Sequence, residues 1–217
     1  MTSTAGSHGG RRRLLIATRS HHKLQELRAL LGLDGFELVS LDDIGVEEEA
    51  VEDAASFRGN AIIKARFYGR LTGSPTLADD SGLEVDALGG RPGVRTRRYA
   101  GENATDAQNN AKLLAELEGV PPAERTARYR CVLAYFDPGW TASGGRRRVV
   151  TRAGTYEGRI AVVPRGSGGF GYDPIFEPAT EPIGGRTVGQ LSAAEKNRAS
   201  HRGKAARAMA RYLREAT

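Results

Sequence analysis

The segment over residues 77–90 constrains the fold more than any other part of this chain. An apolar approach ends at Ala78 and runs directly into two carboxylates, a hydroxyl and a glycine. This pattern predicts a buried strand over residues 75–78 that ends at a polar, sharply turning rim. If Asp79 and Asp80 still lie on the strand, their side chains point to opposite faces, so only one carboxylate faces a given pocket. A plain surface turn is the alternative interpretation, because Asp, Ser and Gly all favour turns.

A strand followed by a capped helix is predicted near the start of the chain. Residues 14–17 predict a buried strand, after which Ser20 can cap a helix that ends at Gly32. The N–H groups and the dipole at the start of such a helix favour an anion, so Thr18, Ser20 and Lys23 form a candidate phosphate site. The segment lacks the glycine pattern of a Walker or dinucleotide loop, and an ordinary strand-to-helix turn is the alternative.

The next part of the chain combines a strand, an acidic run and a second helix. Residues 36–39 predict a short strand, and the three glutamates at 47–49 predict a solvated loop. One acidic residue of this region, which includes Glu52, could still bind a metal ion. Ser56 is a suitable cap for a helix through about Tyr68, with apolar residues at helical spacing on one face.

A long hairpin is predicted in the middle of the chain. Residues 129–136 and 147–156 favour β-structure and can pair across the turn formers of residues 137–145. Cys131 lies in the first arm, where a lone cysteine is more often a core residue than a nucleophile. As the single cysteine of the chain it excludes an intramolecular disulfide and any cysteine-based metal cluster.

Three more helices are predicted from the residues that cap them. The last of these helices carries Ala205, Met209 and Leu213 inward, and its first turn contains His201 and Arg202. Taken alone, polar residues at a helix start are solvated side chains. An irregular basic loop is expected before the first of the three, over residues 91–101. The capping residues are Thr105 with Gln108, Ser192 with Glu195, and Ser200.

A glycine-rich segment over residues 166–176 surrounds two aromatic residues. Glycines flank Phe170 and Tyr172, so the backbone can approach a ligand closely and an aromatic ring can stack on a flat base. A purine base would suit such a loop. The alternative is a glycine-rich turn that leads into a buried strand at residues 175–176.

The composition is that of a globular protein with an excess of basic residues. Of 217 residues, 39% are hydrophobic, which provides ample material for a core, and no stretch approaches the roughly 18 apolar residues of a membrane span. The start of the chain also lacks the apolar core of a signal peptide, so we expect a cytoplasmic protein. The net charge of +6 suits nucleic acid or a phosphate-rich small molecule, but only 6% of residues are aromatic. We therefore expect no membrane and no stable nucleic-acid partner.

Four segments together resemble the inosine triphosphate pyrophosphatase family of noncanonical purine nucleoside triphosphatases. Their order and spacing make a chance match improbable, and the resemblance covers about residues 13–214. The segments are Thr18-x-x-x-x-Lys23, Ala78-Asp-Asp-Ser-Gly82, Gly169-Phe-Gly-Tyr-Asp-Pro174 and Glu195-Lys-Asn-x-x-Ser-His-Arg202.

The resemblance implies an α/β fold with two lobes on a long, twisted mixed β-sheet flanked by helices. After a disordered N-terminal tail over residues 1–12, residues 13–217 would form a single two-lobed domain that works as a homodimer. The implied activity is the Mg²⁺-dependent hydrolysis of ITP, dITP or XTP to the monophosphate and pyrophosphate, which cleanses the nucleotide pool. A Maf-like nucleotide pyrophosphatase, which the four motifs do not match, and a basic nucleic-acid-binding protein are the alternatives.

The resemblance also implies roles for particular residues. Asp80 would be the proton acceptor and a Mg²⁺ ligand, with Glu52 as the second metal ligand. Carboxylates suit Mg²⁺, which prefers hard oxygen ligands, while Lys23 and Lys64 could offset the charge of the leaving pyrophosphate. The residues expected to bind substrate are Thr18, Arg19, Ser20, His21, His22, Lys23, Ser81, Phe170, Gly171, Tyr172, Asp173, Lys196, His201 and Arg202.

Two positions depart from the family's pattern. Arg19 and Ser20 stand where relatives commonly carry Gly-Asn, which affects the geometry of the phosphate loop and one amide contact, although Ser20 can still donate a hydrogen bond. Gly59 stands where relatives usually carry an acidic residue, which affects metal ligation.

Overall fold

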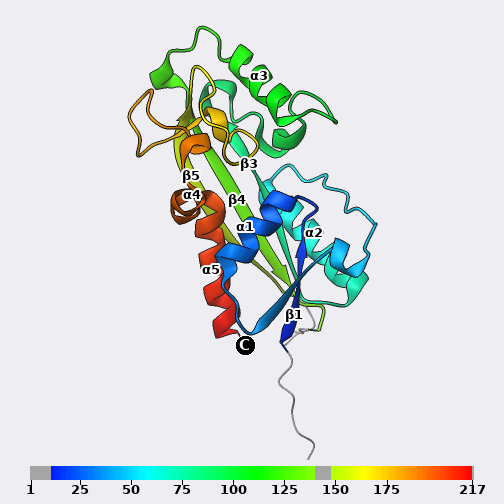
Figure 1. The fold of residues 1–217 in the computed structure, drawn as a ribbon. Helices are drawn as coiled ribbons and strands as arrows, with labels where there is room; N and C mark the ends of the chain where they lie inside the picture. Colours follow the sequence, from blue (N-terminus) through cyan, green and yellow to red (C-terminus); the bar gives the residue numbers. More distant parts are fainter. Residues whose placement is uncertain (1–10, 140–147, 217) are drawn as a thin grey trace, which may run out of the picture.

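The computed structural model describes residues 11–139 and 148–216, which build a six-stranded mixed sheet with helices on both faces (Figure 1). The strand order is β2-β1-β3-β4-β5-β6, in which β1 pairs in parallel with β2 and β3 and the other neighbours are antiparallel. This arrangement confirms the mixed α/β sheet. The strands are β1 (Arg12–Ala17), β2 (Phe36–Ser40), β3 (Thr76–Val85), β4 (Thr126–Phe136), β5 (Val149–Ile160) and β6 (Phe176–Pro178).

The helices begin at the residues that the sequence predicts. Each has a Ser or Thr at its N-cap whose side chain accepts a hydrogen bond from the first helical turn, and Gly32 ends the first helix in the left-handed conformation. The predicted capping boxes at Thr105 and Ser192 are both present. The helices are α1 (His21–Leu31), α2 (Phe57–Thr72), α3 (Asp106–Glu116), α4 (Ala193–Ala199) and α5 (His201–Glu215).

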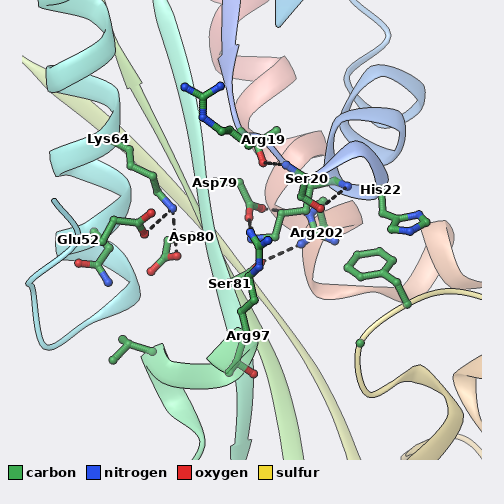
Figure 2. A pocket seen from close by; sticks show the side chains of 18 of the residues that line it. Arg19, Ser20, His22, Glu52, Lys64, Asp79, Asp80, Ser81, Arg97 and Arg202 are labelled. Carbon is green, nitrogen blue, oxygen red and sulfur yellow. Dashed lines mark hydrogen bonds and ion pairs between the residues drawn. The ribbon is translucent and has the colours of Figure 1, made fainter. Parts of the chain in front are cut away.

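Strand β3 is much longer than predicted, and the expectation that it ends at Ala78 is wrong. Asp79, Asp80 and Ser81 are all carried by β3 (Figure 2), which pairs with β4 from Thr76 to Val85. The acidic residues stay in the strand because β4 continues to supply its hydrogen bonds. Gly82 permits close packing here: a Cβ atom on it would lie 2.8 Å from the carbonyl oxygen of Gly93 and from the ring of Phe57.

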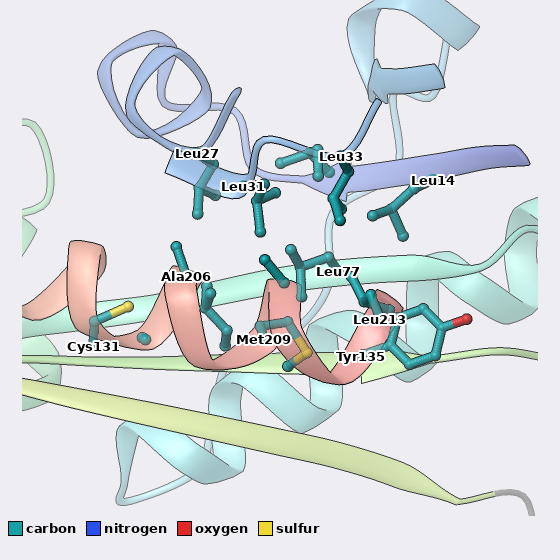
Figure 3. Close-up of a cluster of buried hydrophobic side chains, with 14 of the residues drawn as sticks. Leu14, Leu27, Leu31, Leu33, Leu77, Cys131, Tyr135, Ala206, Met209 and Leu213 are labelled. Carbon is teal, nitrogen blue, oxygen red and sulfur yellow. The ribbon is translucent and has the colours of Figure 1, made fainter. Parts of the chain in front are cut away.

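Helices α1 and α5 cover one face of the sheet, and α2 covers the other (Figure 1). Leucines of α1 pack against Met209 and Leu213 of α5 and against Leu14 and Leu77 of the sheet (Figure 3). The inward stripe predicted for the last helix is thus confirmed, as is the core position of Cys131. The stripe of α2 packs beneath β3 and β4 on the opposite face. Asp79 and Asp80 therefore sit between two buried layers.

A third cluster of buried side chains lies at the α3 end of the long strands (Figure 1). Tyr129 packs there together with Leu113 of α3, with Ile175 just before β6 and with Phe176 of β6. This cluster fixes the glycine-rich segment against the sheet.

Smaller differences from the expected boundaries have local causes. Strand β1 begins at Arg12, which pairs with β2, and α2 runs one turn beyond Tyr68 to the left-handed Gly73. The basic loop contains a 3₁₀ helix over Gly93–Arg98, and a 3₁₀ turn over Asp173–Ile175 precedes β6. The long hairpin is confirmed by the pairing of β4 with β5.

Parts of three expectations lie outside the described residues. They are the first ten residues of the disordered tail expected over residues 1–12, most of the hairpin turn, and the start of its second arm at residue 147. The expected end of the tail at residue 12 is wrong, because Arg12 already pairs with β2. Within residues 11–139 and 148–216, no helix combines the length and the apolar character that a membrane span requires.

Candidate active site

A cavity of about 780 Å³ opens along the edge of β3 beyond Ala78, where the pairing with β1 ends, and brings the four sequence motifs together (Figure 2). It is large enough for a nucleotide, since ligand pockets typically measure about 300–1,000 Å³. Every residue expected to bind substrate or metal lines it, from the phosphate-loop candidate at residues 18–23 to His201 and Arg202. The first and last motifs lie more than 170 positions apart in the sequence, and the sheet is what joins them.

The segment between β1 and α1 forms one end of the cavity. Ser20 caps α1 by accepting a hydrogen bond from the N–H of Lys23 at 3.4 Å, and Thr18 Oγ1 accepts one from the N–H of Ser20 at 3.2 Å. The first turn of α1 thus directs its N–H groups toward the cavity, as an anion site requires. Arg19 turns to the acidic loop instead and donates to the carbonyl oxygens of Val46 and Glu48, at 2.9 and 3.1 Å. These bonds tie the two loops together.

Asp79 is buried on the α1 and α5 side of the sheet, where it is surrounded by donors. Lys23 Nζ lies 2.7 Å from Oδ1, and Arg202 Nε donates to Oδ2 at 3.1 Å. Ser81 and Cys131 also donate to this carboxylate, at 2.9 and 3.1 Å. Burial alone raises the pKa of Asp79, but the charges of Arg202 and Lys23 hold it well below its ordinary value. Asp79 is therefore an anion at neutral pH, and it organises the cations around it.

Asp80 points to the opposite face, as the alternation along a strand predicts, but both carboxylates line the same cavity, so the expectation that only one of them faces a given pocket is wrong. Lys64 Nζ of α2 lies 3.2 Å from Oδ1 of Asp80 and 2.8 Å from Oε2 of Glu52 (Figure 2). The other oxygen, Oδ2, is buried and has no hydrogen-bond partner among the described residues. Burial raises the pKa of Asp80 against the opposing effect of Lys64 and Lys23. A carboxylate with one unpartnered oxygen and a raised pKa is suited to accept a proton.

The same corner fits a divalent cation. Glu52 and Asp80 both direct an oxygen at a single ammonium group, so two carboxylates already converge on one positive charge. Mg²⁺ usually takes one or two protein carboxylates and completes its shell with water and phosphate oxygens. In the part of the chain that the structure describes, no group of three or more His, Cys, Asp or Glu residues could hold a metal. Phosphate oxygens of a substrate would therefore have to supply further ligands.

Phe170 lies at the other end of the cavity, between two glycines in the left-handed region. Gly169 and Gly171 have φ angles of 76° and 63°, which only glycine adopts readily. The amide of Phe170 donates to Asp173 Oδ2 at 2.9 Å, and Lys196 Nζ lies 4.4 Å from the centre of the Phe170 ring. The ring is thus held beside cations, as expected for a surface that stacks on a base.

A chain of alternating charges joins the two ends of the cavity. Lys196 Nζ lies 2.6 Å from Asp173 Oδ2 and 2.8 Å from Glu26 Oε1, and the other oxygen of Glu26 pairs with Arg202. Arg202 in turn pairs with Asp79 and hence with Lys23. Glu26 was missed by the sequence analysis, although its position three residues after Lys23 places both on one face of α1.

The alternative interpretation of His201 and Arg202 as solvated residues is wrong. Their exposed fractions are 5% and 1%, because α5 begins against β4 and the charge of Arg202 is fully paired. The His201 ring stacks on Tyr129 with a centroid separation of 4.7 Å, and its Nδ1 is buried without a partner among the described residues. Burial, together with the neighbouring Arg202, lowers the pKa of His201 well below its ordinary value. The imidazole is therefore neutral at neutral pH.

Two polar residues of α3 hold the loop that carries Phe170. Asp106 Oδ2 accepts a hydrogen bond from the N–H of Gly171 at 2.7 Å, and Asn110 Nδ2 donates to its carbonyl oxygen at 3.1 Å. The backbone N–H and C=O of Gly171 are thus both fixed by the first turns of α3. The sequence analysis missed these residues because they lie more than 60 positions away from the loop.

Comparison with known proteins places this chain in a family. The sequence model of the Ham1 family matches residues 14–212. The dITP/XTP pyrophosphatase of Geobacter sulfurreducens is 49% identical over 193 residues, which cover 89% of this chain and 92% of the relative. The dITP/XTP pyrophosphatase of Mycolicibacterium paratuberculosis is 50% identical over 197 residues, with coverages of 89% and 92%.

Solved structures give the same result for the fold. A HAM1 protein from Coxiella burnetii superimposes with a TM-score of 0.81 at 38% identity, covering 94% of this chain and 99% of that chain. The Ham1 protein of Staphylococcus aureus gives a TM-score of 0.80 at 32% identity, with coverages of 95% and 100%.

Proposed function

The chain belongs to the Ham1 family, and from this premise we propose that it hydrolyses noncanonical purine nucleoside triphosphates such as dITP, XTP and ITP. The products are the nucleoside monophosphate and pyrophosphate, and the role is to cleanse the nucleotide pool. The single observation that carries the proposal is that four motifs, distant in sequence, line one nucleotide-sized cavity that has a carboxylate corner at one side and an aromatic loop at the other.

Asp80 is the proposed catalytic residue. Its unpartnered Oδ2 accepts a proton from a water molecule as the water oxygen attacks the α-phosphorus, and the bond between the α-phosphorus and the bridging oxygen breaks to release pyrophosphate. Lys64 stays beside it and offsets negative charge that develops on the phosphates.

Phosphate binding is assigned to the segment from Thr18 to Lys23. N–H groups at the start of α1 and the ammonium of Lys23 face the cavity and attract the triphosphate. We propose Mg²⁺ as the cofactor, held by Asp80 and Glu52 together with substrate oxygens, where it would polarise the phosphates as a Lewis acid. The two convergent carboxylates support this assignment.

Base recognition is assigned to Phe170, Tyr172 and Asp173 together with the charged residues of the last two helices. Lys196 and Arg202 carry only hydrogen-bond donors, which suit the 6-oxo oxygen of hypoxanthine and xanthine. The 6-amino group of adenine would leave such donors unpaired, at a cost of about 1–3 kcal/mol for each buried group.

The oligomeric state and the location are further parts of the proposal. We infer a homodimer, which the resemblance to the family implies, and a cytoplasmic location, which a role in the nucleotide pool supports. Size-exclusion chromatography with light scattering tests the dimer directly: a particle near twice the chain mass of 23.3 kDa is expected.

The decisive experiment compares substrates and identifies products. Purified protein is incubated with Mg²⁺ and, separately, ITP, XTP, dITP, ATP or GTP in water enriched in ¹⁸O. We expect monophosphate and pyrophosphate from the first three, with ¹⁸O in the monophosphate because attack occurs at the α-phosphorus. Diphosphate with orthophosphate would contradict the proposal. Absence of turnover, with salt-sensitive binding to DNA or RNA, would support the nucleic-acid-binding alternative instead.

A further inference from the structure

The ring of His22 stacks on the ring of Phe170 and so connects α1 with the aromatic loop. The ring centroids lie 5.0 Å apart and the planes differ by 9°. The sequence pattern groups His22 with the phosphate contacts, since it lies between Ser20 and Lys23. Its ring contact instead places it beside the residues assigned to the base.

The surroundings of His22 leave its ring free to move. The side chain is exposed, in the first turn of α1, and it makes no hydrogen bond or ion pair that the structure records within residues 11–139 and 148–216. Phe170 is held by its backbone, through Asp173 and through the α3 contacts of Gly171, and its ring also lies beside Lys196 and Arg202. One ring is thus anchored and the other is adjustable.

The separation of the two rings sets what could lie between them. A flat base in contact with both faces needs the rings about 7 Å apart, since aromatic carbon contacts are about 3.5 Å each. The rings must therefore separate by roughly 2 Å, which a change of the exposed His22 rotamer can supply. In the structure the two rings close this space by stacking on one another.

We propose that the purine base inserts between Phe170 and His22, so that His22 forms the second wall of the base site. The inference rests on the proposed function, because it takes a purine nucleotide as the ligand. It assigns His22 to the base and not to the phosphates, and it makes the aromatic ring, not the imidazole nitrogens, the group that matters.

Calorimetric titration with IMP and with inorganic pyrophosphate separates the two assignments. We compare the wild type with His22→Ala, His22→Phe and Gln25→Ala, the last an exposed control on the same helix. Loss of a base–aromatic stack weakens binding by roughly tenfold, so His22→Ala should raise the Kd for IMP by about that factor. It should leave the Kd for pyrophosphate within about twofold. His22→Phe should restore IMP binding, and Gln25→Ala should bind both ligands like the wild type.

Each other result overturns the inference. Unchanged IMP affinity in His22→Ala would show that the ring is no wall, and tighter IMP binding would show that it competes with the base for Phe170. Equal loss of affinity for IMP and for pyrophosphate would show that His22 contacts the phosphates and not the base. If the wild type hydrolyses ITP while His22→Ala binds IMP normally, the inference fails and the proposed function stands. If the wild type neither hydrolyses ITP nor binds IMP, both fail.

Discussion

Asp79 and Asp80 are neighbours in β3, yet their carboxylates serve opposite faces of the sheet. Asp79 is completely enclosed by Lys23, Arg202 and two weaker donors, whereas Asp80 meets Lys64 and keeps one oxygen unpartnered among the described residues. The pKa of the first is lowered and the pKa of the second is raised. Substitutions of these two neighbouring aspartates are thus expected to have different effects, one on turnover and the other on stability.

The Asp80→Asn substitution should remove turnover and spare the fold. The amide cannot accept the proton from water, so kcat for ITP should fall by about 10²–10⁴, the usual contribution of a general base. The free energy of unfolding should change by less than about 1 kcal/mol, because Lys64 keeps Glu52 as a partner. Steady-state kinetics and urea unfolding of the same preparation check both. A near-normal kcat in the variant would show that Asp80 is not the general base.

The Asp79→Asn substitution should instead destabilise the protein. It leaves Lys23 and the buried Arg202 without their shared anion, and breaking a buried ion pair from one side typically costs about 3–5 kcal/mol. Urea unfolding against the Asp80→Asn variant is the matched comparison. A loss below about 1 kcal/mol would mean that Glu26 alone satisfies Arg202.

His201 should make the fold sensitive to mild acid. Its pKa is lowered well below 6.5 in the folded state, so below that pH the unfolded chain binds a proton that the folded chain does not. Stability is then retained above pH 6.5 and lost as the pH falls, by at most about 1.4 kcal/mol per pH unit for one proton.

The matched comparison for this prediction is His201→Gln, which cannot take up the proton. Between pH 7 and pH 5, the wild type should lose about 1–2 kcal/mol more than the variant in urea unfolding. Other titrating groups are common to both proteins and cancel in the difference. Parallel pH profiles would mean that the folded state accommodates the charged imidazole.

Glu52 should determine the Mg²⁺ concentration that the enzyme requires for activity. Chelation with EDTA should abolish turnover, and Glu52→Gln should raise the Mg²⁺ concentration for half-maximal rate by about tenfold, with little change in IMP affinity. The neighbouring exposed Asp53→Asn is the control. An unchanged Mg²⁺ requirement would exclude Glu52 as a ligand.

Asp106 should position the aromatic loop from a distance. Asp106→Ala removes the acceptor for the N–H of Gly171, so the Phe170 ring becomes less ordered and KM for ITP should rise about fivefold, the effect of one hydrogen bond near 1 kcal/mol. Because the reacting atoms are untouched, kcat should stay within about twofold. Asp106→Asn keeps an acceptor oxygen and should restore KM. A fall in kcat with constant KM would contradict this positioning role.

Local signals in the sequence predicted most helix starts and several site residues. Capping acts within three or four residues, so Ser20, Ser56 and Thr105 could be recognised as caps without knowledge of the fold. The motifs likewise named the side chains that line the cavity, because the types of residue needed for phosphate and base binding are present in the sequence itself.

Long-range packing determined the length of β3 and the partners of two site residues, which local sequence patterns did not predict. Asp, Ser and Gly after Ala78 favour a turn locally, but β4, some fifty residues away, extends β3 through all of them. Larger separations, of 176 and 65 positions, concealed Glu26 as a partner of Arg202 and Asp106 as a partner of Gly171.

The sequence alone therefore determined the order of helices and strands and the chemistry available to the site, since both depend on residue type and on neighbours along the chain. Only the tertiary structure decided which of two adjacent carboxylates is paired and which is left with an open oxygen, because charge pairing and burial depend on side chains brought together from α1, α2 and α5. Because burial makes an unpaired charge costly, the burial and the charge partners of each carboxylate set its pKa, and the pKa in turn decides which role the carboxylate can take.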